Sequence, residues 1–162
     1  MADDASIRDL LARVLGWGEA HLTLEAAVEG LDPALRGVRP TGLPHSIWEL
    51  VEHIRIAQRD LLDFTRPGAY STPDWPREYW PDAPAPPDDA AWARTLERIR
   101  EDALALSGIV HDPAIDLSAP VPHGDRAGQT YARSLLVAQD HAAYHIGQVV
   151  TVRQLLEAAA AG

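Results

Sequence analysis

Helical periodicity in four segments, interrupted by proline and glycine, is the feature that most restricts the fold of this 162-residue chain. Apolar residues recur there every three or four positions, the spacing that puts side chains on one face of an α-helix. The predicted helices cover residues 7–29, 47–64, 89–110 and 131–158. No stretch of useful length alternates like a strand, and no internal repeat is present. Four amphipathic helices of about 20 residues predict an all-α four-helix bundle.

Capping residues support these helix boundaries. Ser46 is followed three residues later by Glu49, the spacing of a capping box, and Ser6 with Asp9 resembles the same motif. Gly30 suits the end of the first predicted helix. The predicted N-caps are Ser6, Ser46, Asp88 and Thr130.

The connection between the second and third predicted helices, residues 65–88, contains seven of the thirteen prolines, so no regular element should persist in it. It is also rich in large aromatic side chains, which a solvated linker lacks. We therefore predict an ordered crossover whose rings pack on the domain. A connection this long can span the bundle, which predicts helices in the order up, down, down, up. The aromatic residues are Tyr70, Trp75, Tyr79 and Trp80.

Length and composition restrict the class of protein. A chain of 162 residues is expected to form a single domain, residues 1–162, with a sizeable core. The net charge of −10 without a basic cluster makes nucleic acid an unexpected partner. The absence of cysteine excludes disulfides and a cysteine nucleophile, and it fits a cytoplasmic location. No signal-peptide pattern and no apolar run of about 18 residues is present, so a membrane association is not expected.

A pair of histidines four residues apart is the strongest chemical signal. His141 and His145 lie on the apolar face of the last predicted helix, so both rings should point into the protein. Buried imidazoles need partners, which a shared metal ion or hydrogen-bonded carboxylates would supply. In the up-down-down-up order, His53 and His21 come to the same end of the bundle as His145. This convergence favours a metal site.

Two stretches carry a resemblance to a known family. They are Ser46-Ile-Trp-Glu-Leu-Val-Glu-His53 and Asp140-His-Ala-Ala-Tyr-His-Ile-Gly-Gln148. With them, nearly the whole chain resembles the DinB/YfiT-like superfamily of predicted metalloenzymes. Pro44 and the segment Tyr79-Trp80-Pro81 resemble one subgroup of it. The combination is specific, although each piece alone is not.

The resemblance implies an up-down-down-up four-helix bundle that is commonly a homodimer. It also implies a divalent metal held by three histidines, which correspond to His53, His141 and His145. Relatives of known activity include transferases and isomerases that use a low-molecular-weight thiol. The family name derives from damage induction and implies no DNA binding.

Three imidazoles with an open coordination position are typical of a catalytic metal site. Zinc and nickel suit imidazole best, while manganese and iron remain alternatives. Such a metal lowers the pKa of a water molecule, polarises a carbonyl or ionises a substrate thiol. Ala142 follows the first histidine of the pair, so the pattern is not the His-Glu-x-x-His motif of zinc proteases.

Four further residues are candidates for the site. Glu49, one turn before His53, is a candidate general base, or only part of the helix cap. His21 is a candidate acid–base group, an outer partner of the metal ligands, or a core histidine bonded to Glu25. Gln148, one turn after His145, could hydrogen-bond a ligand or support the fold.

Trp48, with the crossover aromatics, could line the mouth of a substrate pocket, and ordinary packing is the alternative. Tyr144 and Asp140 should face the surface or a dimer partner. The remaining histidines are expected to be solvated loop residues: His45, His111 and His123.

Three functions are compatible with these residues. The first is a metal-dependent transferase or isomerase that acts on a small molecule with a low-molecular-weight thiol. The second is a metal-dependent hydrolase of a small ester or amide. The third is a non-catalytic bundle that binds a metal or another ligand.

Overall fold

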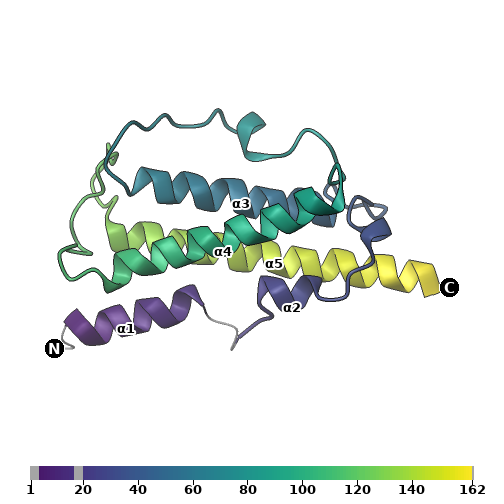
Figure 1. The fold of residues 1–162 in the computed structure, drawn as a ribbon, viewed down its shortest axis with the longest axis horizontal. Helices are drawn as coiled ribbons and strands as arrows, with labels where there is room; N and C mark the ends of the chain where they lie inside the picture. Colours follow the sequence, from purple (N-terminus) through teal and green to yellow (C-terminus); the bar gives the residue numbers. More distant parts are fainter. Residues whose placement is uncertain (1–3, 17–19, 162) are drawn as a thin grey trace.

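The fold is built from α-helices that lie alongside one another (Figure 1). The structure, a computed structural model, describes residues 4–16 and 20–161. Within these residues the five α-helices are α1 (Asp4–Leu15), α2 (Leu24–Val28), α3 (Ile47–Phe64), α4 (Asp89–His111) and α5 (Tyr131–Ala161). Two short 3₁₀ turns, η1 (Pro33–Leu35) and η2 (Arg77–Tyr79), lie in the connections. The described part of the chain has no strand, which confirms the all-α prediction.

The prediction of one helix over residues 7–29 is wrong. The chain forms α1 and α2 instead, and residues 20–23 between them are not helical. Gly16 follows α1, and Thr23 caps α2 by accepting a hydrogen bond from the Ala26 N–H at 3.2 Å. A glycine and a good N-cap favour an interruption that apolar periodicity does not reveal. Residues 17–19, which the prediction included in this helix, lie outside the described residues.

The start of α1 also differs from the prediction. The helix begins at Asp4, so Ser6 lies within its first turn and is not the N-cap. Gly30, predicted as the stop, follows α2 with a positive φ of 66°, the backbone conformation that glycine adopts most easily.

The other predicted helices agree with the structure to within three residues. Ser46 and Glu49 form the predicted capping box at the start of α3. Asp88 accepts a hydrogen bond from the Ala91 N–H at 2.6 Å and caps α4, and Thr130 accepts one from the Arg133 N–H at the start of α5. These local hydrogen bonds explain why the boundaries could be predicted.

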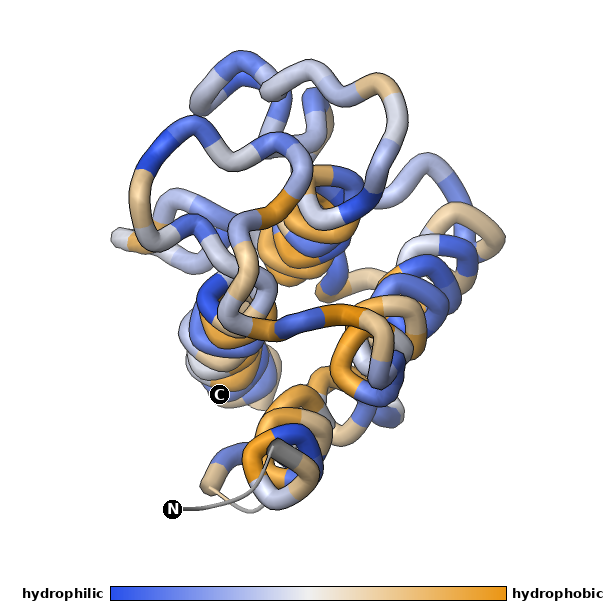
Figure 2. Tube along the Cα trace, turned by 90° about the vertical axis from the view of Figure 1, so that its left-hand side faces the viewer, coloured by the Kyte–Doolittle hydropathy of each residue, from blue (hydrophilic) through white to orange (hydrophobic). Residues whose placement is uncertain are grey.

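The core lies where α3 packs against α4 and α5. Figure 2 shows the apolar sides of the helices turned towards one another. One cluster of buried residues joins α2 to parts of α3, α4 and α5, and a second joins α1 to the opposite parts of the same three helices. Leu50, Leu62 and Leu135 are among the fully buried side chains. The packing of α3 fixes the positions of the residues on its buried face.

The crossover, residues 65–88, runs along the length of α3 (Figure 1). The carboxylate of Asp60 accepts hydrogen bonds from the hydroxyls of Tyr70, at 2.8 Å, and Tyr79, at 2.6 Å. The Ser46 hydroxyl donates to the carbonyl of Pro84 at 2.5 Å. The crossover is thus ordered, as predicted, although Trp75 is 67% exposed and its ring contacts that of Tyr79 at a centroid distance of 5.3 Å.

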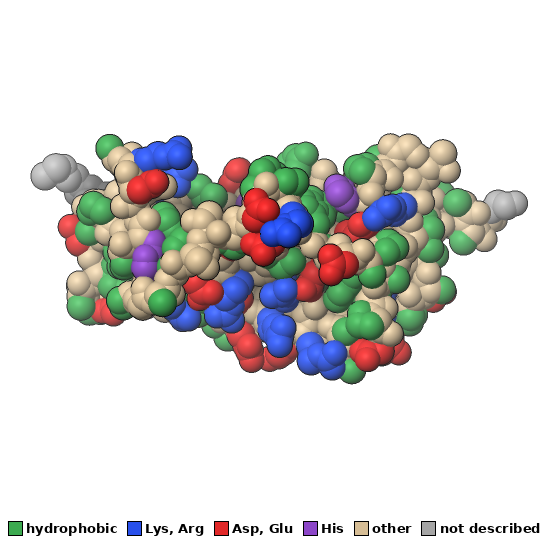
Figure 3. All heavy atoms as spheres, turned by 90° about the horizontal axis from the view of Figure 1, so that it is seen from above, with side chains coloured by type: hydrophobic (Ala, Val, Ile, Leu, Met, Phe, Trp, Pro, Cys, Tyr) green, Lys and Arg blue, Asp and Glu red, His purple; other side chains and the backbone are tan. Residues whose placement is uncertain are grey.

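The face that carries the crossover has mixed charge. In Figure 3, acidic and arginine side chains lie interspersed over it. Many of them form ion pairs, such as Arg55 with Glu52 and Arg77 with Asp74. Over the described ranges, none of the helices combines the length and the apolar character that a bilayer span requires.

Candidate metal centre

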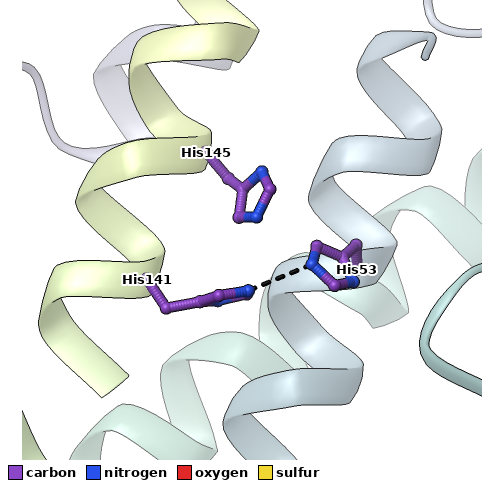
Figure 4. A group of neighbouring side chains, drawn as sticks. All are labelled: His53, His141 and His145. Atoms are coloured by element: carbon purple, nitrogen blue, oxygen red, sulfur yellow. Dashed lines mark hydrogen bonds between the residues drawn. The ribbon is translucent and has the colours of Figure 1, made fainter. Parts of the chain in front are cut away.

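Three histidines from two helices meet beneath the crossover. His53 comes from α3, and His141 and His145 come from successive turns of α5 (Figure 4). Their ring centroids lie 4.5–4.8 Å apart, and one potential ligand nitrogen from each ring falls within 4.8 Å of the others. His53 is 2% exposed and His145 is 7% exposed, while His141 is half-buried. The structure therefore brings together the three residues that the sequence predicted as ligands.

Hydrogen bonds orient two of these rings. The Nδ1 of His53 lies 2.7 Å from the carbonyl oxygen of Tyr79 in the crossover, an acceptor that requires an Nδ1–H donor. The Nδ1 of His145 lies 2.6 Å from Oε1 of Gln148, one turn further along α5. With Nδ1 protonated, Nε2 of each ring is the atom with a free lone pair. Outer partners of this kind fix the tautomer of metal-binding histidines.

The distance between ligand nitrogens fits a shared ion. Nε2 of His53 and Nε2 of His141 lie 3.0 Å apart. Two nitrogens bound to one tetrahedral zinc at about 2.0–2.1 Å are separated by roughly 3.3 Å. Without an ion, the Nε2–H of His141 can donate a hydrogen bond to the unprotonated Nε2 of His53 across this distance, and a cation bound between the rings would replace that proton. The donor set and its spacing thus fit a divalent metal with nitrogen ligands.

The environment keeps the three imidazoles neutral, which is the form that binds metals. Burial lowers the pKa of His141 to about 4, and repulsion from His145 and His53 adds to the effect. Burial also lowers the pKa of His53, although its hydrogen bond to Tyr79 opposes the shift. In the same way, burial lowers the pKa of His145 against the opposing hydrogen bond with Gln148.

An aromatic stack covers one side of the cluster. The indole of Trp80 is parallel to the His53 ring and to the His45 ring, with centroid distances of 3.9 Å to each. Two rings this close to one indole cannot share a face of it, so Trp80 lies between them. The prediction that His45 is a solvated loop histidine is therefore wrong. Its ring is half-buried, and its Nδ1 is buried without a hydrogen-bond partner among the described residues.

Glu49 is held by other groups. Its Oε2 accepts hydrogen bonds from the Ser46 N–H and from Nε of Arg39, both at 2.8 Å, and its Oε1 pairs with the same guanidinium. Burial raises the pKa of Glu49, but these hydrogen bonds outweigh it and leave the pKa below its usual value. A carboxylate with both oxygens engaged and a lowered pKa is a poor proton acceptor. The position favours the helix-cap alternative.

The other candidates lie in different surroundings. His21 is in the connection between α1 and α2, where its Nδ1 contacts the carbonyl of Leu22 at 2.8 Å, so it is not part of the histidine cluster. The predicted partner of His21, Glu25, instead lies 3.4 Å from Arg100. Trp48 is 6% exposed and packs against Trp92 in the core, a position that favours packing over pocket lining.

Several groups near the cluster could not be predicted from the residue pattern. The Tyr79 carbonyl belongs to the backbone, and no residue pattern could assign it to His53. Arg39 and His45 lie in a connection without regular structure, so periodicity does not place them. The aromatic segment that contains Trp80 was a usable signal, because large rings in a proline-rich connection indicate packing.

The sequence was also compared with models of protein families. The model of the DinB superfamily matches residues 18–149, which include all three clustered histidines. This chain belongs to the DinB superfamily. No curated protein matches it, and neither does any solved structure. The histidine cluster of this DinB-superfamily protein is in accord with metal binding.

Proposed function

We propose that this DinB-superfamily protein is a divalent-metal-dependent enzyme, most simply a transferase or isomerase that uses a low-molecular-weight thiol. The observation that carries the proposal is the convergence of His53, His141 and His145 with one ligand nitrogen from each within 4.8 Å of the others. Three neutral imidazoles leave a coordination position for a substrate, whereas structural zinc sites are closed by a fourth protein ligand.

The residues of the chain have separate roles in this proposal. The three histidines hold the ion, and the Tyr79 carbonyl and Gln148 keep their rings in the binding tautomer. Bound there, a divalent ion supplies Lewis-acid chemistry that lowers the pKa of a thiol or polarises a carbonyl. Trp80 excludes water from one face of His53.

The thiol has to come from outside the chain, because the sequence contains no cysteine. Family membership supports thiol chemistry, since the resemblance to thiol-dependent relatives covers the histidine motifs. Because both oxygens of the Glu49 carboxylate accept hydrogen bonds, Glu49 is a poor general base. The same contacts are unfavourable for a hydrolase that would need Glu49 as its base. A hydrolase of a small ester or amide and a non-catalytic metal-binding bundle are the alternative functions.

Several finer features belong to the same proposal. We assign zinc or nickel as the metal, before manganese or iron, because three imidazoles are the ligands. The helices are in the order up, down, down, up, with α1 and α2 together in the place of the first helix. The protein acts as a cytoplasmic homodimer on a small molecule, and the 65% exposed ring of Tyr144 is available for a dimer contact.

The test is metal analysis followed by a thiol screen. Protein purified without chelator or metal-affinity resin is expected to contain one divalent ion per chain, measured by elemental analysis. The loaded protein is then incubated with electrophilic small molecules and a panel of low-molecular-weight thiols, and conjugates are detected by mass spectrometry. Ester or amide cleavage without thiol consumption would support the hydrolase instead. Protein with full metal and neither activity would support the binding function.

A further inference from the structure

A half-open cavity beside the histidine cluster has the character of a second binding site. It has a volume of about 440 Å³ and lies where α1 and α2 are interrupted, between these segments and α3, α4 and α5. Each clustered histidine is followed directly by a residue that lines the cavity: Ile54, Ala142 and Ile146. The cavity therefore lies at the level of the histidines but on the neighbouring faces of α3 and α5.

The size and lining of the cavity fit a small apolar molecule. The cavity is half-open to solvent, and its volume lies within the 300–1,000 Å³ of most ligand pockets. Much of the wall consists of aliphatic side chains: Leu15, Leu24, Ile54, Ile99, Ala142 and Ile146. The charged residues Glu25 and Arg100 lie 3.4 Å apart and neutralise each other, so the lining does not favour a charged ligand.

One buried amide in the wall has an unused acceptor. Gln58 is 8% exposed, and its Nε2 donates to the carbonyl of Ile99 at 2.7 Å. Because a carbonyl oxygen accepts only, this bond fixes the orientation of the amide. No described residue donates to the remaining atom, Oε1. Because Oε1 is not one of the fully enclosed unpaired atoms of the described residues, it is accessible to solvent, and the donor of a ligand would replace water there.

His21 also lines the cavity, and its Nδ1 lies 2.8 Å from the Leu22 carbonyl. The cavity thus combines a largely apolar wall with the acceptor of Gln58 and a paired Glu25 and Arg100. Those properties select a neutral molecule that carries an O–H or N–H donor.

We propose that this cavity binds a small, neutral, largely apolar molecule with a single hydroxyl or N–H donor, of the phenol class, which donates to Oε1 of Gln58. This binding does not depend on the proposed metal chemistry, because none of the three histidines lines the cavity. The cavity is lined in part by residues on both sides of the helix interruption that the sequence did not predict.

The test is calorimetric titration of the full chain with 4-propylphenol and with its methyl ether, which has no donor. The phenol is expected to bind at one site, about two- to tenfold more tightly than the ether, the usual effect of one neutral hydrogen bond. Gln58→Leu should remove that preference. If the wild-type protein shows no saturable binding of either probe, the proposal is overturned. If it binds both probes with equal affinity, the role of Gln58 is overturned.

Filling the cavity provides the second arm. Ala103→Trp and Ser107→Trp place an indole in the cavity from α4, and each should weaken binding of both probes at least tenfold. Ala93→Trp, on the exposed face of the same helix, is the matched control and should bind as the wild type does. Circular dichroism identifies any variant that does not fold, in which case the other filling variant decides. Unchanged binding in a folded filling variant would place the probe elsewhere and refute the assignment.

Discussion

Replacing Gln148 tests whether the hydrogen bond to His145 supports metal binding. In the structure, Oε1 of Gln148 lies 2.6 Å from Nδ1 of a ring that is 7% exposed, and its Nε2 donates to the Tyr144 hydroxyl at 3.3 Å. Gln148→Leu removes the acceptor but keeps a side chain of similar size. The Nδ1–H of His145 then loses its partner, and the ring is free to change tautomer and present the wrong nitrogen to the metal.

The expected loss follows from the burial of His145. A buried donor left without an acceptor costs about 1–3 kcal/mol. That range agrees with the 10–100-fold loss of metal affinity, about 1.4–2.7 kcal/mol, that is usual when an outer partner of a ligand is removed. Gln148→Glu keeps an acceptor and adds a negative charge, so it should retain the affinity or increase it.

The assay is competition for zinc and nickel against a chromogenic chelator at pH 7.5, with the dissociation constant measured for each variant. Gln154→Leu, an exposed position on the same helix, is the control for replacing a glutamine in α5. If Gln148→Leu binds either metal within twofold of the wild type while Gln154→Leu behaves normally, the hydrogen bond does not orient the ligand and our reasoning fails.

Three further predictions concern the cluster and the core. In elemental analysis, His141→Ala should no longer contain stoichiometric metal. The control His111→Ala, at an exposed position at the end of α4, should keep it. The reverse result would exclude the proposed ligand set. Chelator-treated protein should lose stability as the pH falls from about 6.5 to 4. In that window the unfolded chain binds protons at histidines whose pKa is lowered in the folded protein, to about 4 for His141. A free energy of unfolding in urea that does not change with pH over this range would contradict the prediction. Arg59→Leu should lower the free energy of unfolding by about 1–2 kcal/mol, because it leaves the buried carboxylate of Asp102 without its ion-pair partner. Asp102 is 2% exposed and lies 2.5 Å from Arg59, and its Oδ2 has no partner among the described residues. Asp102→Leu, which removes the buried charge itself, should change it by less than about 1 kcal/mol, and equal losses in the two variants would refute the argument.

Local signals in the sequence were sufficient for much of the fold. The limits of α3, α4 and α5 follow from apolar periodicity and from N-caps that bond to residues three positions away. The same periodicity placed His141 and His145 on one face of α5. The grouping of this pair with His53, which lies 88 residues before His141, was predicted from the assumed helix order and from the family resemblance, not from a local signal. The helix limits and the shared face of His141 and His145 depend on helix geometry and on interactions within a few residues along the chain.

The tertiary structure decided which partner each polar group has. Whether Glu49 serves as a base or as a cap depends on Arg39, ten residues away in an irregular connection. The acceptor for His53 is a crossover carbonyl 26 residues further on, and Trp80 reaches the same ring from the next position. The interruption between α1 and α2, which periodicity did not predict, likewise places residues of both helices in the wall of one cavity. Such contacts are selected by the packing of distant segments, so the local sequence determined which side chains could bind a metal, and the fold determined how they are oriented.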